Sequence, residues 1–130
     1  MRLELFLTLI IILITSCSTS LTPTETLDRS IVASQKGDAE TRWELSSQKT
    51  REKLLKNKSK DEVLENFRKE VFMYKLIKSW ETEIVEQSEN QVKMKMNYKF
   101  FDPHSKKVID ESTDVTLVKE AGLWKIEDDD

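Results

Sequence analysis

A nine-residue stretch in the second half of the chain alternates strictly between apolar and polar side chains, and it sets the strongest limit on the fold. Val92, Met94, Met96, Tyr98 and Phe100 alternate with Lys93, Lys95, Asn97 and Lys99. Side chains of a β-strand point to its two faces in turn, so this period of two predicts a strand with one apolar and one basic face. Half-buried strands of this kind belong to antiparallel sheets. The chain is therefore expected to build an antiparallel sheet with its core on one side.

Three further strands are predicted around this one. Trp80, Thr82 and Ile84 alternate with charged residues before it, and a turn is expected at Asn90. Residues 102–105, Asp-Pro-His-Ser, form a second turn, which leads to a return strand from about Lys107 to Lys119. Ala121-Gly122 then turns into a last strand that carries Trp124 and Ile126.

The return strand has its own two faces. Its inward residues are expected to be Ile109, Thr113, Val115 and Leu117, while Asp110 and Asp114 share the outer face with the lysines of the preceding strand. Cross-strand pairing accounts for these acids and lysines without any ligand.

The part of the chain before the sheet has a helical pattern. Thr22, Pro23 and Glu25 form a capping box that opens a helix, and Gly37 is placed to end it. Asp38 can cap a second helix, which carries Trp43 and Leu45 and ends near Ser47. A capping box at residues 59–62 opens another helix, on which Val63, Phe67, Val71 and Tyr74 form one stripe. The stretch 71–74 alone could instead lead into a strand.

Residues 49–60 are basic. A solvated helix and loop is favoured there over contact with anionic head groups or an acidic partner.

The first residues have a different character. Residues 5–14 are apolar apart from Thr8, a run too short to cross a hydrocarbon core of about 30 Å and as long as the apolar region of a signal peptide. The stretch from Ile14 to Cys17, Ile-Thr-Ser-Cys, then resembles a lipobox, the processing site of bacterial lipoproteins. Arg2 alone supplies the positive leading region, and the alternatives are an uncleaved anchor or a buried strand with an incidental cysteine.

The lipobox resemblance implies where the protein is made and held. Residues 1–16 would be a signal peptide, Cys17 the lipidated first residue, residues 17–22 a short tether, and residues 23–130 one domain. Two or more acyl chains on Cys17 would anchor that domain stably to the membrane. Ser18 after the cysteine, rather than Asp, resembles lipoproteins that many Gram-negative bacteria sort to the outer membrane. We therefore expect a protein of the bacterial cell envelope.

Composition excludes several functions. Cys17 is the only cysteine among the 130 residues, so an internal disulfide and a cysteine metal cluster are both excluded. The net charge of −3 does not suggest a nucleic-acid binder, which would carry a concentrated basic face. No phosphate loop, nucleophile elbow or metal-ligand spacing occurs, so no cofactor and no metal are expected.

Helices followed by a four-stranded meander make an α+β plan, and two stretches resemble the cystatin-like cone fold of the nuclear transport factor two-like superfamily. One runs from residues 22–26, Thr-Pro-Thr-Glu-Thr, to the Lys-Gly-Asp step at 36–38; the other is the ending at residues 115–126. The resemblance covers nearly all of the chain after the tether. It implies N-terminal helices packed on a curved four-stranded antiparallel sheet, enclosing a cone-shaped pocket used for catalysis, ligand binding or dimer contacts.

Few residues are candidates for chemistry. His104, the only histidine, falls in a turn, Tyr98 is more often a core residue at such a position, and Glu111 points inward only if no bulge turns it out. An apolar pocket could be lined by Trp43, Met94, Met96, Tyr98, Phe100 and Trp124, although such a cluster is more often core.

These observations favour a noncatalytic binding or assembly module, anchored through Cys17, that recognises an envelope protein or a small apolar ligand. The alternative is a cone-fold enzyme or a small apolar ligand carrier with an unrecognised pocket site. An open cone of several hundred cubic ångströms with Tyr98 or Glu111 inside would favour the alternative.

Overall fold

The computed structural model describes residues 20–128. The expected signal peptide, Cys17 and the first tether residues lie outside the described residues. Within this range, five helices come first: α2 (Pro23–Lys36), α3 (Ala39–Glu44), α4 (Gln48–Leu54), α5 (Lys60–Lys69) and α6 (Val71–Tyr74). Four strands follow: β1 (Ile77–Gln87), β2 (Gln91–Asp102), β3 (Lys107–Glu120) and β4 (Leu123–Glu127). The strands form one antiparallel sheet in chain order, which confirms the predicted α+β fold class.

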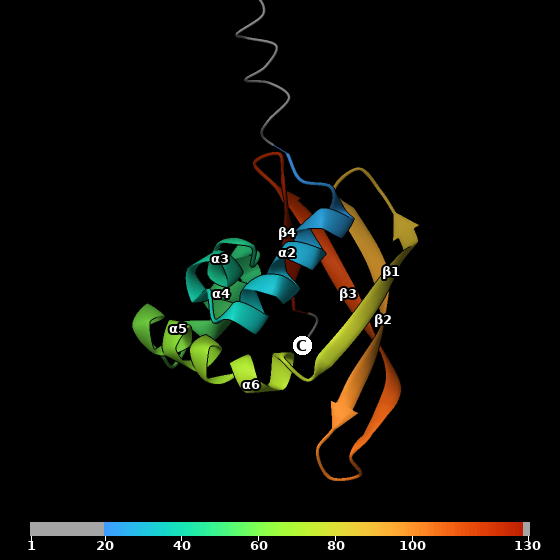
Figure 1. Ribbon diagram of the computed structural model, residues 1–130. Coiled ribbons are helices and arrows are strands. Elements are labelled where there is room, and N and C mark those ends of the chain that lie inside the picture. Colours follow the sequence, from blue (N-terminus) through green and yellow to red (C-terminus); the bar gives the residue numbers. More distant parts are fainter. Residues whose placement is uncertain (1–19, 129–130) are drawn as a thin grey trace, which may run out of the picture.

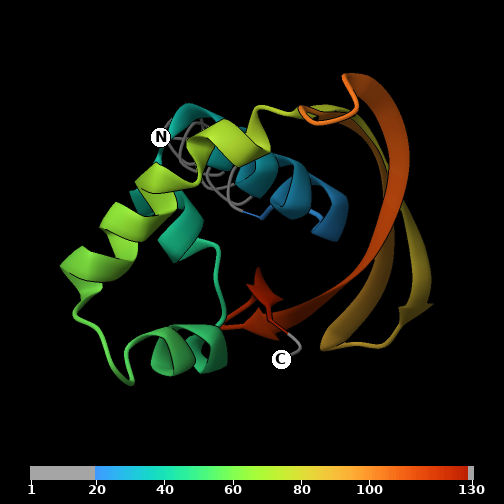
Figure 2. The same ribbon diagram turned by 90° about the horizontal axis from the view of Figure 1, so that it is seen from below.

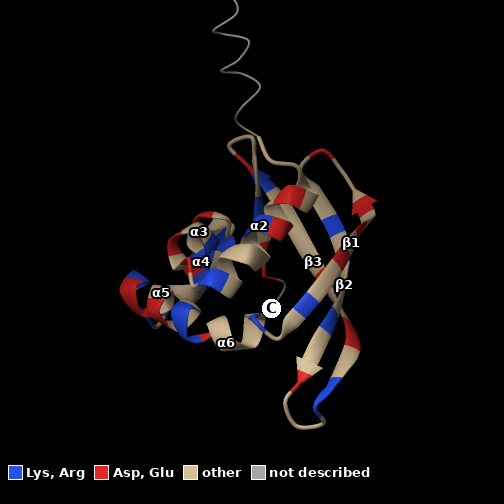
Figure 3. Cartoon of the chain, viewed as in Figure 1, with Lys and Arg blue, Asp and Glu red and all other residues tan. Residues whose placement is uncertain are grey.

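The helices all lie on one side of a strongly curved sheet (Figures 1 and 2). Helix α2 runs along the concave face, and the shorter helices close the side opposite the sheet. No helix between residues 20 and 128 covers the convex face. On it, each lysine of β2 lies beside an acid of β1, of β3 or of both (Figure 3). Lys99 Nζ lies 3.1 Å from Asp110 Oδ1, and Lys95 is in register with both Glu83 and Asp114. The polar side of the alternating strand is thus accounted for by cross-strand partners.

Capping side chains fix where α2, α3, α4 and α5 begin. Thr22, Asp38, Ser47 and Ser59 each accept a hydrogen bond from the backbone N–H three residues on, at 3.2 Å in every case. Helix α2 ends at Gly37, whose φ of 75° lies in the left-handed region that glycine adopts without steric cost. The predicted caps at residues 22, 38 and 59 are therefore confirmed, and Ser47 adds one for α4 within the basic stretch.

The expected stripe of residues 63–74 does not lie on one helix. The chain breaks at Glu70 into α5 and the single turn α6. Val63 and Phe67 are buried, whereas Val71 and Tyr74 are only half-buried, and Phe72 and Met73 are exposed. The break turns α6 across the end of α2, where Gln35 Nε2 donates to the carbonyl oxygens of Tyr74 and Ile77. Residues 71–74 are thus helical and do not begin a strand.

The core formed by residues 20–128 is divided into three clusters rather than one. Trp43, Val63, Leu64 and Phe67 pack together in the helical layer. Leu27 and Ile31 of α2 pack against Met96 of the sheet. The third cluster contains Val92, Met94 and Leu117. Strand β4 connects the layers, because Ile126 N donates to Leu45 O at 2.7 Å and Ser47 N donates to Ile126 O at 2.8 Å. The helical cluster and the α2–sheet cluster do not merge, and a cavity lies between them.

Candidate functional site

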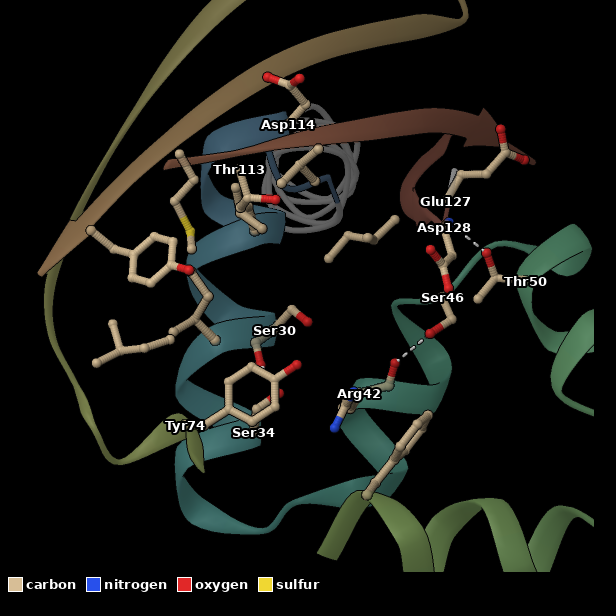
Figure 4. A pocket seen from close by; sticks show the side chains of 18 of the residues that line it. Ser30, Ser34, Arg42, Ser46, Thr50, Tyr74, Thr113, Asp114, Glu127 and Asp128 are labelled. Atoms are coloured by element: carbon tan, nitrogen blue, oxygen red, sulfur yellow. Dashed lines mark hydrogen bonds between the residues drawn. The ribbon is translucent and has the colours of Figure 1, made fainter. Parts of the chain in front are cut away.

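The cavity has a volume of about 610 Å³ and is partly open to solvent. It is bounded by α2, by the layer of α3 to α6, and by β2, β3 and the end of β4 (Figure 4). Ligand pockets in proteins typically measure about 300–1,000 Å³ and combine an apolar lining with a few placed polar groups. The size alone is therefore that of a binding site for a small molecule.

One wall of the cavity is apolar. Leu27 and Ile31 project from α2, and Met96, Val115 and Ile126 face them from the sheet. Leu27 and Ile31 lie four residues apart and so share one helix face, while Met96 belongs to the inward set of the alternating strand. This wall offers contact to an apolar group.

Arg42 forms the polar end of the cavity. Its Nη1 lies 2.7 Å from Glu70 Oε2, and its guanidinium carbon lies 4.0 Å from the centre of the Phe67 ring and 5.0 Å from that of the Tyr74 ring. The side chain is 18% exposed. The break between α5 and α6 makes this arrangement, since it places Phe67, Glu70 and Tyr74 around one guanidinium. Ring stacking and the ion pair together hold the group in a fixed plane.

Hydroxyl groups make up much of the remaining lining, and some already have backbone or side-chain partners. Ser34 Oγ donates to Ser30 O at 2.8 Å, Ser46 Oγ donates to Arg42 O at 2.9 Å, and Thr50 Oγ1 accepts from Asp128 N at 2.8 Å. Four other lining residues have side-chain hydroxyls that make no hydrogen bond to any residue between 20 and 128: Ser30, Tyr74, Tyr98 and Thr113. In Figure 4 the Ser30, Tyr74 and Thr113 hydroxyls point toward the open space. These groups are available to a ligand.

Acidic residues lie at the C-terminal side of the cavity. Asp114, Glu127 and Asp128 line it, but Figure 4 shows the Asp114 and Glu127 carboxylates turned away from its centre. The carboxyls whose pKa the fold lowers lie elsewhere. Hydrogen bonds from the Thr41 hydroxyl and backbone N–H lower the pKa of Asp38, and the His104 backbone N–H, followed by the Ser105 hydroxyl, lowers that of Asp102. Both carboxylates serve a helix cap or a turn.

The residues proposed from sequence as pocket-lining are spread over five surroundings. Met96 and Tyr98 line the cavity. Met94 is buried in the third cluster, and Phe100 is half-buried toward the hairpin end of the sheet. Trp43 lies inside the helical cluster, with Arg51 and Lys60 over its ring. Trp124 lines a hollow of about 200 Å³ at the start of α2 instead.

The two other residues weighed for chemistry are outside the cavity. His104 is exposed in the turn between β2 and β3, where its backbone N donates to Asp102 Oδ1 at 3.0 Å. Glu111 is exposed, and it pairs in register with Tyr98 without lining the cavity. Within the described part, no group of three or more His, Cys, Asp or Glu side chains could hold a metal ion.

Arg42, Ser30 and Ser34 were not singled out from the sequence. Ser30 and Ser34 lie on the same helix face as Leu27 and Ile31, and small polar residues on a core-facing stripe leave room that the sheet does not fill. That pattern was a usable signal. Arg42 gave none, because its place depends on the break at Glu70.

No protein-family model and no curated protein sequence matches the chain. Solved structures do match. A candidate NTF2-like transpeptidase from Campylobacter jejuni aligns with a TM-score of 0.52 at 15% identity, covering 82% of this chain and 98% of that one. An NTF-2 like protein of unknown function from Shewanella oneidensis aligns with a TM-score of 0.50 at 16% identity, covering 81% of this chain and 95% of that one. The chain has an NTF2-like fold. At these identities the likeness extends to the fold alone, and the function must be argued from the NTF2-like cone of this chain itself.

Proposed function

We propose that the protein is a lipid-anchored cell-envelope domain that binds a small amphiphilic ligand, without chemistry, in its cone. The observation that carries the binding role is the open cavity of about 610 Å³, in which an apolar wall faces hydroxyls that have no partner in the described chain. Core packing normally fills space of this size, and hydroxyls turned inward normally find a partner. A cavity that keeps both open is suited to a ligand.

The anchoring role rests on the sequence before residue 20. An apolar run of signal-peptide length precedes Cys17, and only Ser18 and Thr19 separate that cysteine from the first described residue. The first described residues lie at the end of the molecule that carries the β3–β4 turn, while α6 lies at the opposite end (Figure 1). A lipid on Cys17 would thus keep the β3–β4 turn near the bilayer and direct the polar end of the cavity away from it. No helix among residues 20–128 is long and apolar enough to cross a membrane.

An enzyme is the second candidate, because the cone is open and Tyr98 lines it. Acid–base catalysis needs a positioned donor and acceptor within hydrogen-bond reach of the reacting group. Neither Tyr74 nor Tyr98 is joined through its hydroxyl to a base in the described chain, and two of the lining carboxylates point away from the centre. Binding without chemistry therefore accounts better for the arrangement.

Metabolic labelling with a fatty acid tests the anchor. The wild-type protein should take up label and sediment with membranes, and Cys17→Ala should do neither, because the thiol is the proposed acceptor. Ser16→Ala is the matched control, since it keeps a small residue before the cysteine and should be labelled normally. Absence of label on the wild-type protein would refute the anchoring claim.

Filling the cavity tests the binding role. Ser30→Phe adds a ring inside the cone, whereas Val32→Phe adds the same ring on the exposed side of α2, where Val32 is 36% exposed. Calorimetric titration with decanoate should show at least about a tenfold loss of affinity for Ser30→Phe, because the ring takes the volume that the chain would occupy. Val32→Phe should bind as the wild type does. Equal binding by both variants would rule out the cone as the site.

A further inference from the structure

We propose that Arg42 recognises a two-oxygen anionic head, a carboxylate or a phosphate, on a ligand whose apolar chain lies between α2 and the sheet. The inference rests on the proposed function, because it names the class of ligand that the cone would bind. It assigns a specific role to one side chain.

The guanidinium of Arg42 has N–H donors that make no hydrogen bond within residues 20–128. Arginine carries five N–H groups, and in the described chain only Nη1 has a hydrogen-bond acceptor, Glu70 Oε2 at 2.7 Å. The side formed by Nε and Nη2 has no hydrogen-bond partner there. These two nitrogens form a planar fork whose spacing matches the two oxygens of a carboxylate or phosphate. A half-buried fork of this kind is a ready pair of donors for an anion with two acceptor oxygens.

The fork is held in place before any ligand arrives. The Phe67 ring lies against the guanidinium at 4.0 Å, the Tyr74 ring approaches it at 5.0 Å, and Glu70 fixes one corner. Arginine side chains usually lose considerable rotamer freedom when they bind, and this contact set removes that cost in advance. The arrangement therefore favours recognition by Arg42 over a purely structural ion pair.

The surroundings of Arg42 also favour an acceptor group on the ligand. The Ser30 and Tyr74 hydroxyls point into the same space and can each donate a hydrogen bond (Figure 4). Beyond them lie Leu27, Ile31 and Met96, which offer only apolar contact. Donors at one end and apolar side chains at the other match an anionic head followed by a hydrocarbon chain.

Glu70 limits the attraction and so provides a test. It offsets the charge of Arg42, and Glu127 and Asp128 add negative charge at the other side of the cavity. Long-range steering of an anion is therefore weak, and discrimination must come from short-range bonds to the fork. Replacing Glu70 with Gln removes the competing negative charge but keeps an oxygen that can accept from Arg42 Nη1, so the fork stays in place and anion binding should become stronger. If the pair were purely structural, the same change would lower the stability of the protein without strengthening anion binding.

The experiment is a calorimetric titration of the mature protein with four ligands of matched chain length: decanoate, decyl phosphate, decanol and decyltrimethylammonium. The wild type should bind both anions at least about tenfold more tightly than the alcohol, and the cation most weakly, because charge-assisted hydrogen bonds to Arg42 form only with the anions. The carboxylate and phosphate arms show which head the site prefers.

Three variants assign the effect. Arg42→Met should bring the two anions down to the affinity of the alcohol, and Glu70→Gln should raise anion affinity several-fold. Arg68→Met is the matched control, since Arg68 pairs with Glu40 and Glu65 on the surface of α5 and should leave all four affinities unchanged.

Equal affinity for decanoate and decanol in the wild type, or weaker anion binding by Glu70→Gln, would overturn the role of Arg42. Glu70→Gln keeps Arg42 and so decides the question even if Arg42→Met fails to fold. These results would leave the cone as a binding site intact. The cone itself fails separately, if Ser30→Phe binds all four ligands as the wild type does.

Discussion

Single side chains in this protein fix where helices begin, and Asp38 is the clearest case. Its Oδ1 accepts from Thr41 N at 3.2 Å and its Oδ2 from Thr41 Oγ1 at 2.7 Å. These bonds start α3 and so set the position of Arg42 one turn further on. They also favour the ionised form, which is why the pKa of Asp38 lies below its ordinary value.

Asp38→Ala is expected to lower the free energy of unfolding by about 1 kcal/mol at neutral pH, the usual effect of losing an N-cap. Because the folded-state pKa is depressed, the contribution of the charge is complete above the pKa of the unfolded chain and is lost as the pH falls through the folded pKa. Urea unfolding between pH 7 and pH 3 measures both effects. Asp38→Asn keeps a hydrogen-bond acceptor, so its free energy of unfolding at pH 7 should fall by less than that of Asp38→Ala. An equal fall for the two variants would contradict the role assigned to the cap.

At the scale of elements, the sequence predicted the helix starts and the sheet well because both depend on local patterns. The alternation at residues 92–100 defined β2, and three caps set helix starts. The break at Glu70 was not predicted. It is stabilised by distant contacts, such as those of Gln35 with Tyr74 O and Ile77 O, which no local pattern records. The polar end of the cavity was missed for the same reason.

The end of α2 offers a prediction about backbone geometry. Gly37 and Gly122 both have φ in the left-handed region, at 75° and 79°, but a Cβ at Gly37 would lie 3.2 Å from Val71 Cγ2 while one at Gly122 would touch nothing. Gly→Ala should therefore destabilise at both positions by about 1 kcal/mol, and more at Gly37 because Val71 of α6 must also move. Thermal unfolding of the two variants compares them. A larger effect at Gly122 would contradict the packing of α6 against the end of α2.

At the scale of the whole molecule, the division of the core explains the cavity. The alternating strand was expected to place five apolar side chains together, and its inward face instead serves two clusters and the cone. Val92 and Met94 pack with Leu117, whereas Met96 and Tyr98 face the open space. Pattern alone gives the inward face of a strand. Whether that face is filled or left open depends on the curvature of the sheet and on the helices across from it, which are set by the whole chain.

The methionine methyl groups offer the most direct test of the cone as a binding site. After cleavage before Cys17 the chain would keep Met73, Met94 and Met96, of which Met96 lines the cavity, Met94 is buried outside it and Met73 is exposed on α6. Carbon-13 methyl NMR during titration with decanoate should shift the Met96 signal in a saturable way and leave those of Met94 and Met73 nearly unchanged. A saturable shift of Met73 alone, or no shift of Met96 at saturation, would contradict ligand binding in the cone.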